Sequence, residues 1–253
     1  MSNDVTHYLI GVAEQAGIYL LLLAPVVMAG LLMPSARPRR LLPLLLFAAL
    51  LTLDVAVLEL SRVLHLVPGW GGWNWQGKLL ESTWPLILVA LLPMLTAANT
   101  GLTFETARGS WTVMLIVCLV YVALNLPLQL ALGAHFSLHV KMPTLLFQAS
   151  MPGLGEELAY RGVLLALLNK VFGRPWRLWG AQYGFGLVVI SVMFGLLHGL
   201  DIRGFRVRHV FWPEMTYAFL VGLTLTWLRE RTGSVWPGVV FHNLANVMNF
   251  LFV

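Results

Sequence analysis

Two adjacent glutamates stand inside an apolar stretch of this 253-residue chain, and they are the residues best suited to do chemistry. Glu156 and Glu157 open the run Glu-Glu-Leu-Ala-Tyr-Arg, so Glu157 and Arg161 are four residues apart. On a helix this spacing puts the two on one face, where they can pair, while Glu156 points about 100° away. We therefore expect a Glu157–Arg161 ion pair and a Glu156 that has no local partner and is free to act as a general base.

Two further polar positions interrupt apolar segments downstream. Phe194 and His198 are four residues apart at the end of one segment, and His242 and Asn246 are four apart in the last one, with Asn243 beside them. Peptide hydrolysis needs a base for water, a proton for the leaving amine and donors where negative charge develops. A glutamate near a histidine can supply the first two, and an imidazole N–H with an asparagine amide can supply the third. These residue types would suit the active site of a peptide hydrolase if helix packing brings them to one cavity.

The composition indicates that these residues lie in a membrane. Hydrophobic residues make up 58% of the chain and charged residues 11%, whereas soluble domains carry about 25% charged residues. The net charge of +5 does not indicate a nucleic-acid partner, because the basic residues are scattered, mostly at the ends of apolar segments, as is typical of membrane proteins. The single cysteine, Cys118, cannot form an internal disulfide, and no Cys/His zinc spacing is present.

Eight apolar segments approach the length of about 20 residues that a membrane helix needs. They are 8–33, 41–61, 79–96, 111–132, 156–172, 183–199, 211–229 and 235–253. A short interfacial helix is expected at 144–151, with Pro152-Gly153 separating it from the fifth segment. The sequence therefore predicts an all-α, polytopic transmembrane bundle of about eight membrane helices, which forms a single integral membrane domain over residues 1–253.

Three motifs follow one another on successive predicted helices: Glu-Glu-x-x-x-Arg at Glu156, Phe-x-x-x-His ending at His198, and His-x-x-x-Asn at His242. In this combination the chain resembles the CPBP family, which includes the type II CAAX prenyl endopeptidases and the bacterial abortive-infection proteins. The resemblance covers about the last hundred residues and divides the chain into N-terminal membrane helices, 1–142, and a CPBP-like catalytic core, 143–253.

The resemblance implies a glutamic intramembrane endopeptidase that needs no metal or other cofactor. Glu156 and His198 would activate the water, and His242 and Asn246 would form the oxyanion hole. Four residues are expected to support this site, namely Glu157, Arg161, Phe194 and Asn243. The implied substrate is a membrane-associated or lipidated protein or peptide, such as a prenylated C terminus, a peptide pheromone or bacteriocin, or a C-terminal sorting anchor. We expect a multi-pass protein of a bacterial inner or cell membrane. The sequence makes no prediction of its oligomeric state.

Three alternatives remain open at the level of the sequence. A zinc-dependent protease could use Glu156, His198 and His242 as ligands, although no His-Glu-x-x-His motif is present. A non-catalytic immunity or scaffold protein would bind another membrane protein without using the motifs. A transporter could use the intramembrane carboxylates as proton sites, but no inverted repeat or pair of broken helices supports it.

Other charged positions give weaker indications. Asp54 and Glu59 are five residues apart and do not closely share a helix face. We expect Glu59 to pair with Arg62, and Asp54 to line the cavity or contact another helix. His135 and His139 lack a third ligand nearby, so a metal site there is not expected.

The orientation in the membrane also stays open. Nine of the sixteen Lys and Arg residues fall in loops opposite the motifs, including the basic run 37–40, and six fall on the motif side. This places the motif face outside under the positive-inside rule, whereas CAAX-type relatives open toward the cytosol.

Overall fold

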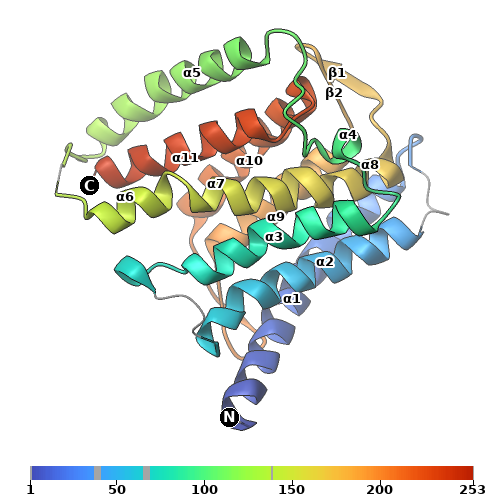
Figure 1. Ribbon diagram of the computed structural model, residues 1–253, viewed down its shortest axis with the longest axis horizontal. Coiled ribbons are helices and arrows are strands. Elements are labelled where there is room, and N and C mark those ends of the chain that lie inside the picture. The colour runs from blue at the N-terminus through green and yellow to red at the C-terminus, as the bar shows by residue number, and fades with distance from the viewer. Residues whose placement is uncertain (1, 37–40, 65–68, 138, 253) are drawn as a thin grey trace.

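Helices running roughly side by side build most of the computed structural model, which describes residues 2–36, 41–64, 69–137 and 139–252 (Figure 1). The side chain of Arg62 is also outside the described part, as is the expected basic run 37–40. The prediction of an all-α membrane fold is confirmed. The described strands are four short segments in two hairpins.

The N-terminal half contains the helices α1 (Ser2–Leu31), α2 (Leu41–Glu59), α3 (Trp75–Leu91) and α5 (Ser110–Ala131). Between them lie the 3-10 turns η1 (Leu60–Arg62) and η2 (Trp70–Gly72) and the single turn α4 (Ala97–Thr100). Helix α3 begins earlier than expected because the Asn74 side chain accepts a hydrogen bond from the Gly77 N–H, which satisfies a free donor of the first turn. It ends at Leu91, since Pro93 favours an extended conformation at the residue before it.

The fifth predicted segment starts earlier than the sequence indicates. Helix α6 (Met142–Gln148) ends before Pro152, and α7 (Met151–Glu156) continues into the π-helical segment η3 (Glu157–Leu164) and then α8 (Leu165–Phe172). The expectation that Pro152-Gly153 separates two helices is therefore wrong. Pro152 lies in the first turn of α7, where a helix tolerates the missing N–H. Consequently Glu156 lies more than one turn inside a helix, next to a π segment of the kind that often marks functional sites.

The C-terminal half adds α9 (Gly186–Gly199), α10 (Trp212–Thr232) and α11 (Trp236–Leu251). A hairpin of β1 (Trp176–Leu178) and β2 (Ala181–Tyr183) precedes α9, so the start of the sixth predicted segment is strand and turn rather than helix. A second hairpin, β3 (Leu200–Ile202) and β4 (Val207–Val210), follows α9 and carries the basic segment 203–208 in and beside its turn.

The helix formed by α7, η3 and α8 runs through the middle of the bundle, with α5 and α11 on one side and α2 and α3 on the other (Figure 1). Its apolar side chains are almost wholly buried, among them Leu158, Val163, Leu164, Leu165, Leu167 and Leu168. A helix surrounded on all sides is apolar all round. Any charged group on it must therefore find a partner inside the protein.

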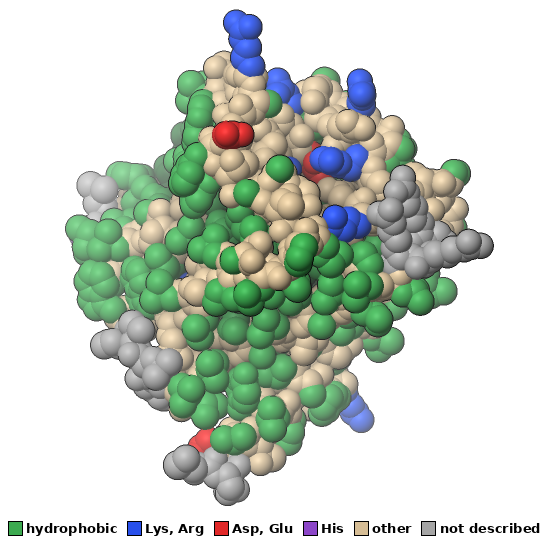
Figure 2. All heavy atoms as spheres, turned by 45° about the vertical axis from the view of Figure 1, so that its right-hand side comes forward, with side chains coloured by type: hydrophobic (Ala, Val, Ile, Leu, Met, Phe, Trp, Pro, Cys, Tyr) green, Lys and Arg blue, Asp and Glu red, His purple; other side chains and the backbone are tan. Residues whose placement is uncertain are grey.

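In the part of the chain that the structure describes, three helices are long and apolar enough to cross a membrane, with spans at Asp4–Leu31, Leu41–Glu59 and Ser110–Ala131. Helix Gly186–Gly199 is apolar but shorter. The outer helix α5 exposes a row of large apolar side chains, including Leu115, Leu119 and Leu124, as a lipid-facing helix does. Figure 2 shows hydrophobic side chains over much of one face, with most of the Lys and Arg side chains gathered in its upper part. The count of eight membrane helices stays a prediction.

Candidate active site

Glu156 lies at the centre of a cluster of polar side chains that come from four helices. It is buried, and its Oε1 accepts a hydrogen bond of 2.6 Å from Lys78 Nζ on α3. Its Oε2 faces two imidazoles, at 3.9 Å from His198 Nε2 on α9 and 3.8 Å from His242 Nε2 on α11. No described group hydrogen-bonds to Oε2. The fold thus brings together three of the residues predicted to act on the substrate.

Glu157 forms the expected pair with Arg161, and this prediction is confirmed. Glu157 Oε1 lies 2.9 Å from Arg161 Nη1, and both side chains are completely buried. The same oxygen lies 2.9 Å from His242 Nδ1. Because a carboxylate paired with arginine only accepts hydrogen bonds, His242 Nδ1 donates here. Glu157 therefore sets the orientation of the His242 ring and directs Nε2 toward Glu156.

Phe194 connects the motifs through both its ring and its carbonyl group. The ring lies under the Arg161 guanidinium at 4.2 Å from Cζ, a cation–π contact. It also packs on His198 and His242, with ring centroids 4.3 and 5.8 Å away. The Phe194 carbonyl oxygen lies 2.8 Å from His198 Nδ1. A carbonyl can only accept, so Nδ1 carries the proton, and in the neutral ring Nε2 offers a lone pair toward Glu156.

The two asparagines of α11 lie in different surroundings. Asn243 Oδ1 accepts from the Gly153 N–H at 2.8 Å, and its Nδ2 donates to the Ser150 carbonyl at 3.3 Å. Asn243 therefore ties α11 to the beginning of α7. Asn246 lies one turn beyond His242 and is partly exposed, and its amide makes no hydrogen bond to the described part of the chain.

Lys78 and Glu81 are site residues that the sequence reasoning missed. Lys78 Nζ lies 2.8 Å from Glu81 Oε2 as well as bonding Glu156. The sequence predicted no local partner for Glu156, and the partner that the structure supplies is 78 positions away. A signal was present in the sequence: Lys78 and Glu81 are charged residues three apart at the entry to an apolar segment.

Asp54 is buried at the contact of three helices. Its Oδ2 accepts from the Tyr160 hydroxyl at 2.9 Å and its Oδ1 from Trp84 Nε1 at 3.2 Å. It thus contacts neighbouring helices, which was one of the two expectations for it.

Glu59 accepts a hydrogen bond from Gln15 Nε2 at 2.9 Å. The predicted Glu59–Arg62 pair stays a prediction, because the Arg62 side chain is outside the described part of the structure.

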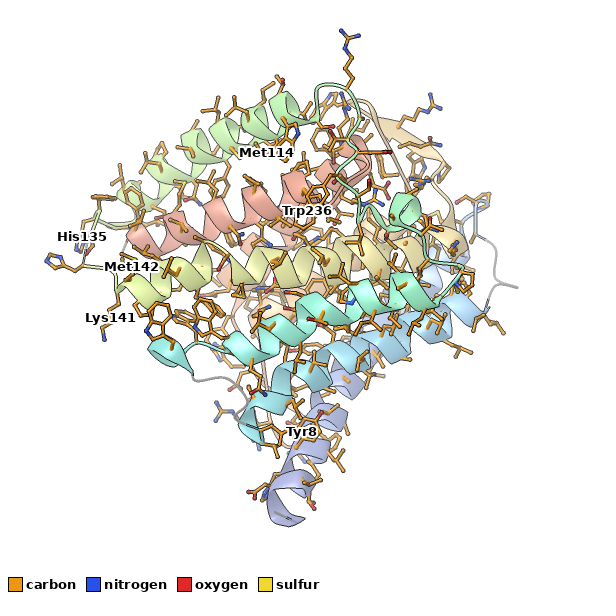
Figure 3. All side chains as sticks on the ribbon, viewed as in Figure 1. Tyr8, Met114, His135, Lys141, Met142 and Trp236 are labelled. Carbon is orange, nitrogen blue, oxygen red and sulfur yellow. The ribbon has the colours of Figure 1, made fainter. Side chains whose placement is uncertain are left out.

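The two histidines of the 135–139 segment lie away from this cluster. Both are exposed, and Figure 3 shows the His135 side chain pointing away from the bundle, beyond the end of α5. Within the residues that the structure describes, no group of three or more His, Cys, Asp or Glu side chains is arranged to hold a metal ion.

Comparison with known proteins identifies the part of the chain that holds the motifs. Residues 137–248 match the family model described as type II CAAX prenyl endopeptidase Rce1-like. This range includes every residue predicted for the site, but not Lys78 or Glu81. No curated protein and no solved structure matches the chain. The resemblance to the CPBP and CAAX protease family is confirmed, and the match indicates a CAAX-type membrane protease with a membrane-associated protein substrate. The segment 137–248 is thus a domain of the type II CAAX prenyl endopeptidase Rce1-like family.

Proposed function

We propose that this protein is a glutamic intramembrane endopeptidase that hydrolyses a peptide bond in a membrane-associated or lipidated protein or peptide. The observation that carries the proposal is the position of Glu156 Oε2, which faces His198 Nε2 and His242 Nε2 at 3.9 and 3.8 Å. These separations are too long for direct hydrogen bonds and suit a water molecule bound between the groups. The His198 side chain is 41% exposed, so water can reach this point.

Glu156 and His198 activate the water in this mechanism. The water donates one hydrogen bond to Glu156 Oε2 and one to the His198 Nε2 lone pair, which aims its oxygen at the scissile carbonyl carbon. As the new C–O bond forms, Glu156 takes the water proton. Glu156 then returns this proton to the nitrogen of the leaving amine as the C–N bond breaks.

His242 and Asn246 stabilise the oxyanion. His242 Nδ1 donates to Glu157, so Nε2 can also donate only when the ring is an imidazolium. The amide of Asn246, one turn away, supplies a second donor.

The proposed reaction uses no metal or other cofactor. The ammonium of Lys78 lies 2.6 Å from the Glu156 carboxylate, and a cation already at this oxygen repels a second one. We further propose that the chain crosses a bacterial inner or cell membrane several times, as its outward-facing apolar helices support.

The test compares cells that carry the wild-type protein with cells that carry Glu156→Gln. Membrane and secreted peptides are identified by mass spectrometry, and the purified proteins are assayed in proteoliposomes with an internally quenched farnesylated CAAX peptide. We expect Glu156→Gln to insert normally and to lose all cleavage, while the exposed Glu105→Gln keeps wild-type turnover. Wild-type turnover by Glu156→Gln, or a wild-type protein that releases no peptide in either assay, refutes the proposal.

A further inference from the structure

Helix α3 lies outside the range 137–248 that matches the protease family, yet it reaches the carboxylate at the centre of the site. We propose that Lys78, held in place by Glu81, is a positioning residue for Glu156: it keeps the carboxylate ionised and turned toward the two histidines. This inference rests on the proposed protease function and gives the N-terminal half of the chain a part in the chemistry.

Lys78 lies between two buried carboxylates. Its Nζ is 2.6 Å from Glu156 Oε1 and 2.8 Å from Glu81 Oε2. The Lys78 side chain is 13% exposed, and that of Glu81 is completely buried. Glu81 lies against Gly155, where an added Cβ would collide with the Glu81 carboxylate. The glycine next to Glu156 thus leaves the space that Glu81 occupies.

The pairing at Oε1 determines what Oε2 can do. A short charge-assisted hydrogen bond fixes one oxygen of a carboxylate, and rotation about the last side-chain bond is then restricted. With Oε1 held on the α3 side, Oε2 remains directed at His198 and His242. Asn, Gln or Ser could donate a similar hydrogen bond, but none of them carries the positive charge of Lys78.

The charge matters because Glu156 is buried. Moving a carboxylate out of water favours its protonated form unless a cation compensates. A protonated Glu156 cannot accept the proton of the attacking water. The other groups around it do not replace Lys78 at Oε1: Glu157 and Arg161 pair with each other, and Asp54 and Glu81 are acidic. His198 and His242 face the other oxygen, Oε2, at 3.9 and 3.8 Å. The ammonium therefore maintains the form of Glu156 that acts as a base.

The test uses Lys78→Met, Glu81→Gln and, as the matched control, Lys141→Met. Figure 3 shows the Lys141 side chain pointing away from the bundle, and it is exposed. The rate constant kcat/KM is measured against pH with the quenched farnesylated peptide in proteoliposomes. For Lys78→Met we expect a fall of about 10- to 100-fold near neutral pH, the size expected for the loss of one hydrogen bond to a charged group.

Two further readouts separate this role from a merely structural one. The acidic limb of the pH profile of Lys78→Met should move to higher pH, and added ammonium ion, which fits the space left by the missing Nζ, should restore part of the activity. Glu81→Gln keeps the ammonium and loosens only its position, so kcat/KM should fall by a smaller factor than in Lys78→Met. Independently of turnover, infrared spectra at neutral pH should show a protonated carboxyl band in Lys78→Met that disappears in Lys78→Met/Glu156→Gln.

The outcomes distinguish the two proposals. If Glu156→Gln is inactive but Lys78→Met keeps wild-type activity and pH profile, or shows no protonated carboxyl band, the role of Lys78 is refuted and the protease proposal stands. If Glu156→Gln remains active, the protease mechanism itself fails. If Lys78→Met does not fold, the pH profile and infrared spectrum of Lys78→Gln decide, and wild-type behaviour of that variant refutes the inference.

Discussion

Replacing Arg161 with methionine tests how strongly the buried ion pair stabilises the fold. Arg161 is completely buried, bonds Glu157 at 2.9 Å and lies 4.2 Å above the Phe194 ring. A hydrogen bond to a charged group contributes about 1.5–3 kcal/mol, and a desolvated cation–π contact about 2 kcal/mol. Methionine fills similar space without charge, so we expect a loss of about 3–5 kcal/mol, in line with other broken buried pairs.

The loss is measured as the free energy of unfolding in mixed micelles titrated with sodium dodecyl sulfate, followed by the fluorescence of the tryptophans. The matched control is Arg203→Met. Arg203 pairs with Asp201 at 3.0 Å, and the two side chains are 76% and 32% exposed. Water and salt screen such a pair, so the control should change the free energy of unfolding by less than about 1 kcal/mol.

A double variant identifies the source of the destabilisation. Most of the expected loss comes from leaving the Glu157 carboxylate buried beside apolar groups without its cation. Arg161→Met/Glu157→Gln removes that charge and should be more stable than Arg161→Met alone. The reasoning is refuted if Arg161→Met costs less than about 1 kcal/mol, the range of an exposed pair. It is also refuted if the loss of stability in the double variant equals the sum of the losses in Arg161→Met and in Glu157→Gln.

Three further predictions concern separate features of the molecule. Tyr160→Phe removes the hydroxyl that donates to Asp54 at 2.9 Å, so the free energy of unfolding should fall by about 1–3 kcal/mol; an unchanged value contradicts the buried hydrogen bond. Asn243→Ala leaves the Gly153 N–H at the start of α7 without its acceptor and should cost about 1–2 kcal/mol in the same titration, whereas an exposed, dispensable contact would cost nothing. Removal of divalent metals with a chelator should leave peptide cleavage unchanged, and a full loss that zinc restores would disprove the metal-free mechanism.

The order of the helices and the pairing of Glu157 with Arg161 could be predicted from the sequence. Apolar runs of membrane-spanning length are visible in composition alone, and residues four apart on a helix meet regardless of what surrounds that helix. The motifs at Glu156, His198 and His242 could be recognised for the same reason, since each lies within one helix. Sequence rules failed where local signals compete: Pro152 can end a helix or begin one, and only its neighbours decide.

The tertiary structure alone decided which groups meet Glu156. Lys78 is 78 positions away, and Asp54 meets Tyr160 across 106 positions. In a bundle whose helices are apolar on most sides, the periodicity of the sequence does not specify which face packs against which neighbour. That choice follows from side-chain packing and from the requirement that every buried charge find a partner. The sequence determined that Glu156 points away from Arg161, and packing supplied the lysine and the two histidines that it faces.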